Sequence, residues 1–178
     1  MDLYEKTVST TSIYNGKVIS LRTEKVKLPN GLEATRELVH HPGAVGIIPI
    51  QKDGKLVVVR QFRKALEKTI IEIPAGKLEK GERPDDSAHR ELEEETGYRA
   101  KEMTYVTTFY TSPGFADELV HMYVAKNLEI GQIDRDEDEF MDVLSISINE
   151  AKSLIASGEI CDAKTMYAVQ YLELLQYQ

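Results

Sequence analysis

Acidic residues crowd into one short stretch of this chain. Between positions 82 and 95 there are seven acidic residues and two basic ones, a net charge of −5. Glu91, Glu94 and Glu95 are three or four residues apart, so on a helix their carboxylates lie along one face. Each such pair repels by roughly a few tenths of a kcal/mol on a bare helix. A hard divalent cation reverses that cost, because Mg²⁺ and Mn²⁺ prefer carboxylate oxygens.

The chemistry that such a cation supports is hydrolysis at phosphorus. A pyrophosphate resists water because its negative oxygens repel the nucleophile, and a divalent cation neutralises them and lowers the pKa of a bound water. A nearby carboxylate can then take the proton. Arg90 stands beside the acids and can orient one of them by a charge-assisted hydrogen bond. The alternative interpretation is a solvated, charge-rich helix face without any chemistry.

A helix is expected to carry these acids. Pro84 suits its first position and Gly97 its end, and two aspartates fall in the first turn, where they suit the positive end of the helix dipole. Ala88 and Leu92 are four residues apart and can face a core on the same side. The helix therefore has one apolar contact face and one acidic face.

The rest of the chain is predicted to form strands, followed by two helices. Turns are predicted at 29–31 and 52–54, where Asn-Gly and Asp-Gly stand between extended runs. The order of elements favours a mixed α/β sandwich over a doubly wound parallel sheet. The expected core strands are 44–50, 55–62, 69–74, 102–111, 118–128 and 143–148, and the expected C-terminal helices are 148–158 and 161–175, the second capped by Asp162.

Composition limits the class of protein. The 178 residues suffice for one domain with a sizeable core, and the net charge of −8 argues against a nucleic-acid backbone as the partner. No run is long and apolar enough for a membrane span, and the N-terminus lacks the pattern of a secretory signal. Cys161 is the only cysteine, which suits a reducing compartment. We therefore expect a cytoplasmic protein with no nucleic-acid or membrane partner.

The stretch from Gly76 to Tyr98 resembles the Nudix box, G-x5-E-x7-R-E-U-x-E-E-x-G-U, in which U is a bulky apolar residue. Every fixed position is filled, and the aromatic Tyr98 stands where an aliphatic residue is usual. The matching residues are Gly76, Glu82, Arg90, Glu91, Leu92, Glu94, Glu95, Gly97 and Tyr98.

The resemblance implies a Nudix hydrolase, which cleaves a nucleoside diphosphate linked to another moiety with the help of Mg²⁺, or alternatively Mn²⁺. It implies a Nudix-type α/β/α sandwich with a mixed sheet in residues 41–178, preceded by a small N-terminal β segment in residues 1–40. The metal ligands that it implies are the carbonyl of Ala75 and the side chains of Glu91 and Glu95, with Glu94 either a further ligand or an acid that supports the ligands. Glu82 corresponds to an auxiliary acid and Arg90 to an orienting residue.

Pro113, fifteen residues after Tyr98, resembles a marker of the ADP-ribose pyrophosphatase subgroup. In that subgroup an N-terminal segment similar to residues 1–40 builds a homodimer whose two active sites are shared. A turn between two strands, and an ordinary edge sheet, are the alternatives for these two features. The substrate contacts that the subgroup implies are Arg36, Glu37, Arg63, Lys77, Ser112, Pro113, Gly114 and Glu118, with Val18 and Ile19 near the adenine.

A further catalytic acid is expected on the loop before the 143–148 strand. Glu139 is the first choice and Glu137 the second, with a solvated charge run as the alternative. Glu72 points to the same end of the sheet as Ala75, so it contacts either the metal or substrate, or else pairs with a nearby arginine.

Three other functions stay open at this point. The first is a Nudix hydrolase of another nucleoside-diphosphate compound, such as a nucleotide sugar, a dinucleoside polyphosphate or an oxidised nucleotide. The second is a non-catalytic Nudix-fold domain that senses ADP-ribose, although such domains usually lose acids of the box. The third is a non-enzymatic scaffold, which predicts no Mg²⁺-dependent thermal shift.

Overall fold

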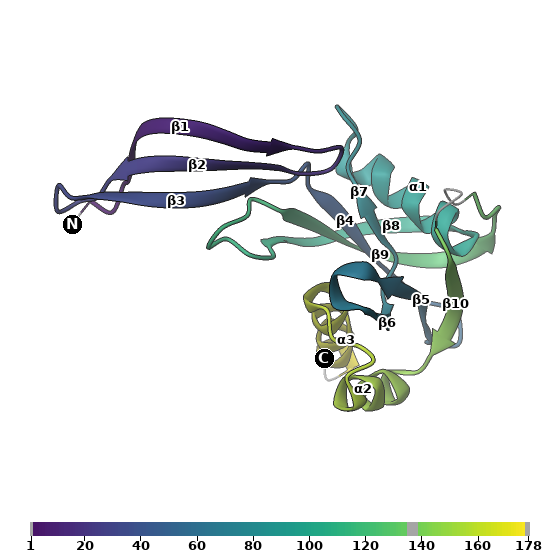
Figure 1. Ribbon diagram of the computed structural model, residues 1–178. Helices are drawn as coiled ribbons and strands as arrows, with labels where there is room; N and C mark the ends of the chain where they lie inside the picture. Colours follow the sequence, from purple (N-terminus) through teal and green to yellow (C-terminus); the bar gives the residue numbers. More distant parts are fainter. Residues whose placement is uncertain (1, 135–138, 177–178) are drawn as a thin grey trace. The chain divides into compact units, whose positions relative to one another are not determined.

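The computed structural model describes residues 2–134 and 139–176 and is a mixed α/β protein, as predicted (Figure 1). Its strands are β1 (Lys6–Asn15), β2 (Ser20–Lys27), β3 (Glu33–His40), β4 (Ala44–Pro49), β5 (Leu56–Arg63), β6 (Lys68–Glu72), β7 (Ala75–Lys77), β8 (Tyr98–Tyr110), β9 (Leu119–Ile130) and β10 (Met141–Ile146). Its helices are the short 3₁₀ turn η1 (Lys64–Leu66) and the α-helices α1 (Pro84–Thr96), α2 (Ile148–Ser157) and α3 (Ala163–Gln176).

The chain forms two compact units. The first comprises residues 1–43 and 109–120, and the second comprises residues 44–108 and 121–178. The first unit holds an antiparallel sheet in the order β1-β2-β3. The predicted turn between β2 and β3 is confirmed, because Gly31 has a φ of +85° and its N–H donates to the carbonyl of Leu28.

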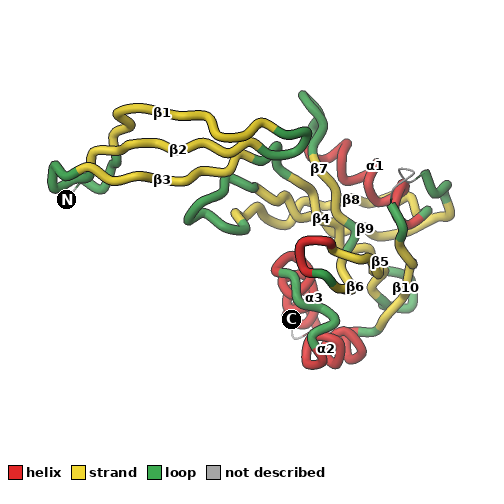
Figure 2. Tube along the Cα trace, viewed as in Figure 1, coloured by secondary structure: helices red, strands yellow, loops and turns green. Residues whose placement is uncertain are grey.

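The second unit contains two sheets, with strand orders β7-β4-β9-β8 and β10-β5-β6. Helix α1, red in Figure 2, packs against β4 and β7 of the first of these sheets. Apolar side chains of α1 are fully buried in this contact, which fixes the face that the helix turns to the sheet. The buried cluster consists of Val45, Ile47, Ala88, Leu92, Tyr123 and Ala125.

The ends of α1 follow the sequence prediction. Pro84 occupies the first turn, and the helix stops at Gly97, whose φ of +72° is the left-handed conformation that glycine tolerates best. The N–H of Gly97 donates to the carbonyl of Glu93, which satisfies one of the last helical acceptors. The chain reverses there and enters β8 directly at Tyr98, four residues before the predicted strand start.

The C-terminal helices also begin at polar caps. Ser147 and Glu150 form a reciprocal capping box at α2, so Ile148 is helical and the preceding strand ends at Ile146 rather than at residue 148. Asp162 caps α3 as predicted, because its carboxylate accepts from the N–H of Thr165 at 3.1 Å. Within the described residues, no helix has the length and apolarity needed to cross a membrane.

Candidate active site

The acidic face of α1 meets the backbone of β7. Strand β7 pairs with β4 in antiparallel register, Gly76 opposite Val45, and this pairing brings its backbone against the helix. A Cβ placed on Gly76 would lie 1.8 Å from Cδ of Glu91, a distance that no real pair of atoms could keep. Glycine at this position therefore lets the backbone of β7 and the Glu91 carboxylate approach each other.

Glu95 is the most buried acid of the helix, with 5% of its surface exposed. Its Oε2 accepts a hydrogen bond from the N–H of Ala75 at 3.1 Å, which ties the helix to the start of β7. The pKa of Glu95 is raised to about 8, chiefly by burial and also by the charges of Glu91 and Glu139, against the lowering effects of the Ala75 N–H and Arg63. In the absence of a cation, this carboxyl group holds its proton at neutral pH.

Glu91 and Glu139 belong to the same electrostatic environment. Burial raises the pKa of Glu91, and the charges of Glu94 and Glu139 act in the same direction against the lowering effect of Arg90. Glu139 is half-buried and affects the pKa values of both Glu91 and Glu95. The structure therefore brings the first-choice loop acid to the helix acids, whereas Glu137 lies outside the described residues.

Arg90 connects four side chains around the acids. Its Nε and Nη2 donate to the two carboxylate oxygens of Glu82 at 2.9 and 3.0 Å, a bidentate pair. Its Nη1 donates to Glu91 at 2.8 Å and to Glu94 at 2.9 Å, and its Nη2 also reaches the hydroxyl of Ser87. The hydrogen bonds from Arg90 lower the pKa of Glu82 to about 2, so Glu82 stays charged. The predicted orienting role of Arg90 agrees with these contacts.

The donor set fits a hard divalent cation. The buried carboxylate of Glu95 accepts from the peptide of Ala75, and the half-buried carboxylate of Glu91 lies in the space that a side chain at Gly76 would fill. Oxygen donors of this kind suit Mg²⁺ or Mn²⁺. Among the described residues, no group of three acidic, histidine or cysteine side chains is arranged to hold a metal ion; Arg90 donates to Glu91, and the Ala75 N–H donates to Glu95.

Glu72 pairs with an arginine, one of the two alternatives that the sequence left open. Arg63 donates to both of its carboxylate oxygens, and Lys164 of α3 donates to one of them. Burial raises the pKa of Glu72, but the bonds from Arg63 and Lys164 outweigh it and hold the pKa below its ordinary value. The positive charge of Arg63 also reaches Glu95. Lys77 is exposed, and its carbonyl accepts from Arg90 at 3.4 Å.

The other predicted substrate residues belong to the first unit. Arg36 makes a bidentate pair with Glu5 at 2.7 and 2.9 Å, and Glu37 is exposed opposite Thr23. Val18 and Ile19 are exposed before β2. Their contacts with substrate stay predictions.

The turn that contains Pro113 is closed by hydrogen bonds within the first unit. The carbonyl of Ser112 accepts from the N–H groups of Phe115 and Ala116, so Pro113 and Gly114 lie exposed at its tip. Glu118 accepts from the hydroxyl of Thr111 at 2.5 Å. The alternative interpretation, a turn between two strands, therefore describes the local structure, and the predicted substrate contacts stay predictions.

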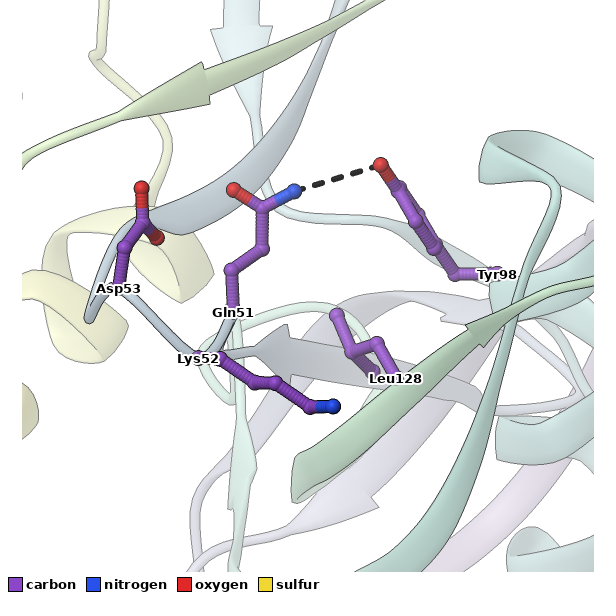
Figure 3. Close-up of a pocket in the computed structure, with 5 residues that line it drawn as sticks. All are labelled: Gln51, Lys52, Asp53, Tyr98 and Leu128. Atoms are coloured by element: carbon purple, nitrogen blue, oxygen red, sulfur yellow. Dashed lines mark hydrogen bonds between the residues drawn. The ribbon is translucent and has the colours of Figure 1, made fainter.

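A separate depression of about 360 Å³ lies in the second unit (Figure 3). Gln51 donates to the hydroxyl of Tyr98 at 3.3 Å across it, and Leu128 supplies an apolar wall. Lys52 and Asp53 complete the lining. None of the acids of α1 lines this depression, so it is not the site described above.

Family comparison agrees with the geometry of the acids. A family model described as the NUDIX domain matches residues 40–168. The chain belongs to the Nudix family. A second model, described as the nucleoside diphosphate sugar hydrolase N-terminal domain, matches residues 5–39 of this Nudix chain.

This Nudix chain is similar to named proteins over almost its whole length. It is 55% identical over 174 residues to a Bacillus subtilis protein named ADP-ribose pyrophosphatase, covering 97% of this chain and 94% of the relative. It is 52% identical to a Bacillus methanolicus protein named methanol dehydrogenase activator, covering 96% and 93%. A solved structure titled ADP compounds hydrolase superposes with a TM-score of 0.87 at 21% identity, covering 100% of this chain and 98% of the other, and this likeness confirms the fold.

The sequence analysis did not predict the contacts of three residues near the acids, Lys164, Thr165 and Gly76. Lys164 and Thr165 reach β6 and the residue after it from α3, and they are 92 positions away from their partners, Glu72 and Ile73. No local pattern marks such pairs. Gly76 was recognised as part of the box, but its close approach to Glu91 was missed, because residue spacing does not show how closely a strand and a helix pack.

Proposed function

We propose that this chain hydrolyses the pyrophosphate bond of ADP-ribose to AMP and ribose 5-phosphate, with Mg²⁺, or alternatively Mn²⁺. The observation that carries the proposal is the pair formed by half-buried Glu91 and buried Glu95 beside Ala75 and Gly76, with Glu139 within electrostatic reach. Glu91, Glu95 and the Ala75 carbonyl would hold the cation, and Glu94 would assist. A bound divalent cation would neutralise the pyrophosphate oxygens and lower the pKa of a bound water.

The chain's own residues supply the remaining functions. Arg90 fixes Glu91 and Glu94 through its Nη1 and is itself fixed by the bidentate pair with Glu82. Glu139 is the carboxylate that takes the proton from the attacking water as the new bond to phosphorus forms. Its half-buried position within electrostatic reach of Glu91 and Glu95 supports this assignment.

The substrate is inferred from relatives. A Bacillus subtilis relative at 55% identity and a Mycobacterium tuberculosis relative at 35% identity over 161 residues are both named ADP-ribose pyrophosphatase. The retention of every acid of the box argues against a domain that only senses ADP-ribose, and against a scaffold.

The proposal is tested by AMP release from ADP-ribose with Mg²⁺ and with EDTA. We expect release with Mg²⁺ and none with EDTA, because the acids alone cannot neutralise the pyrophosphate. The variants Glu91→Gln and Glu95→Gln should fold and lose most of kcat. Wild-type turnover in both variants, or turnover in EDTA, would refute the metal site.

A nucleotide sugar is the second candidate substrate. The match of residues 5–39 to the nucleoside diphosphate sugar hydrolase N-terminal domain favours it, as does a Cronobacter sakazakii relative named GDP-mannose pyrophosphatase at 34% identity over 141 residues. Parallel assays with ADP-ribose, ADP-glucose, GDP-mannose, NADH and 8-oxo-dGTP separate the candidates by kcat/KM. A higher kcat/KM for a sugar nucleotide than for ADP-ribose would replace the first proposal.

We also propose a homodimer built by the N-terminal segment. Strand β1 is exposed along its whole length, and Val8, Ile13 and Tyr14 expose 55%, 56% and 56% of their surface. Apolar residues gathered on one strand favour burial against another chain. Light scattering should give twice the chain mass, and a monomeric mass at assay concentration would contradict the proposal.

A further inference from the structure

The segment Glu72–Ala75 connects β6 to β7 and is held at every position by a group from another element. The carboxylate of Glu72 accepts from Arg63 and from Lys164. The N–H of Ile73 donates to Oγ1 of Thr165 at 2.9 Å, and the carbonyl of Pro74 accepts from Ile47 at 2.9 Å. At the end of the segment, the N–H of Ala75 donates to Oε2 of Glu95 in α1.

Two of these contacts come from the first turn of α3. Asp162 caps this turn and also accepts from Nζ of Lys164 at 2.9 Å, so the cap orients the lysine toward Glu72. Thr165 is fully buried and Glu72 is 2% exposed, which keeps water from replacing either contact. Figure 1 shows α3 and β6, the two elements that these bonds join.

We propose that Thr165 and Lys164 are positioning residues that set the place of the Ala75 carbonyl in the metal site. The inference rests on the proposed function, since it deepens the account of the same site. The ring of Pro74 restricts its φ to near −65°, which removes one backbone rotation by which the segment could absorb a shift of Ile73 before Ala75. Helix α3 would thereby affect the metal site through two backbone residues, without its own side chains contacting metal or substrate.

The first test is Thr165→Val, which keeps the shape of the side chain and removes the acceptor. The N–H of Ile73 is then buried without its partner, and the segment shifts to relieve this cost. The Mg²⁺ concentration for half-maximal thermal stabilisation, measured without substrate, should rise by about tenfold, the low end of the effect of partners behind a metal ligand. AMP release should require a similarly higher Mg²⁺ concentration.

Two control variants separate positioning from stability. Thr165→Ser keeps the hydroxyl and should restore the wild-type Mg²⁺ response. Val169→Ala removes buried methyl groups from the same helix without removing any of these bonds, so it should lower the melting temperature and leave the Mg²⁺ response unchanged. Lys164→Gln leaves the Thr165 hydroxyl in place and should also raise the required Mg²⁺ concentration, which keeps the inference testable if Thr165→Val does not fold.

The outcomes are distinguishable. A wild-type protein that neither releases AMP nor is stabilised by Mg²⁺ overturns the proposed function and this inference with it. The positioning role alone is overturned if the wild type releases AMP and is stabilised by Mg²⁺, but Thr165→Val and Lys164→Gln leave the Mg²⁺ response unchanged, as Val169→Ala does. A raised Mg²⁺ requirement in Thr165→Val that Thr165→Ser reverses supports it.

Discussion

The carboxylate of Glu91 occupies the space in which a side chain at Gly76 would begin, 1.8 Å from Cδ to the position of the missing Cβ. The helix and β7 can approach this closely only because the strand residue is glycine. Gly76→Ala is therefore expected to push Glu91 off its position and to lower Mg²⁺-dependent AMP release by at least about tenfold, as for a displaced metal partner.

Gly54→Ala is the matched control for this change. Gly54 has open space around it but a φ of +82°, so alanine costs about 1 kcal/mol of backbone strain without touching the acids. Equal losses of activity in the two variants would show that Gly76→Ala acts through stability rather than through Glu91.

Protonation of Glu95 should make the stability of the metal-free chain depend on pH. The folded pKa is about 8 against an ordinary value of 4.5, so the folded state holds a proton that the unfolded state has released between these values. Stability is therefore lost as pH rises from 4.5 to 8, at up to about 1.4 kcal/mol per pH unit. Glu95→Gln should remove this loss, since glutamine does not ionise.

Thermal melting in EDTA at several pH values checks the expectation. The difference in melting temperature between Glu95→Gln and the wild type should be small near pH 5 and largest above pH 8, in favour of the variant. Mg²⁺ should bind the wild type more tightly as pH rises over the same range, because the ion must displace the proton. Parallel melting curves at all pH values would contradict the raised pKa.

Arg90→Lys should impair turnover although the charge is kept. A lysine ammonium cannot reproduce the planar set of donors that reaches Glu82, Glu91 and Glu94 together. We expect kcat to fall roughly tenfold to a hundredfold, as for groups that orient metal ligands, with the fold intact by circular dichroism.

Arg99→Lys provides the comparison for the arginine variant. Arg99, in β8, pairs with Glu93 of α1 at 2.7 Å, but its side chain is 65% exposed, and exposed pairs contribute little. Its turnover should match the wild type. A loss of kcat as large as that of Arg90→Lys would point to a general effect of replacing an arginine that pairs with an acid of α1.

Glu139→Gln should lower kcat more than it changes KM, because the side chain acts on the proton of the attacking water rather than on substrate binding. Glu137→Gln tests the second choice on the same loop. Steady-state kinetics at saturating Mg²⁺ distinguishes them. If Glu139→Gln changes KM alone, the residue binds substrate, and a selective kcat loss in Glu137→Gln would transfer the role to that residue.

The local elements could be predicted because their signals are local. Pro84 and Gly97 mark the ends of α1, Asp162 marks the start of α3, and Gly31 marks a hairpin turn, since each acts on backbone groups a few residues away. The predicted end of β10 at residue 148 was wrong because two local signals compete there. Ile148 continues the strand's alternation of apolar and polar residues, but the Ser147 capping box makes Ile148 the first helical residue.

The sequence by itself determined which acids share a helix face, that they surround an arginine, and where that helix begins and ends, because these depend on spacing along one element. Only the tertiary structure decided that Glu95 is buried against Ala75, that Gly76 touches Glu91, and that Glu72 pairs with Arg63 and with a lysine 92 residues away. Burial and the pairing of distant charges depend on how elements pack, and residue spacing along the chain carries no direct information about that packing.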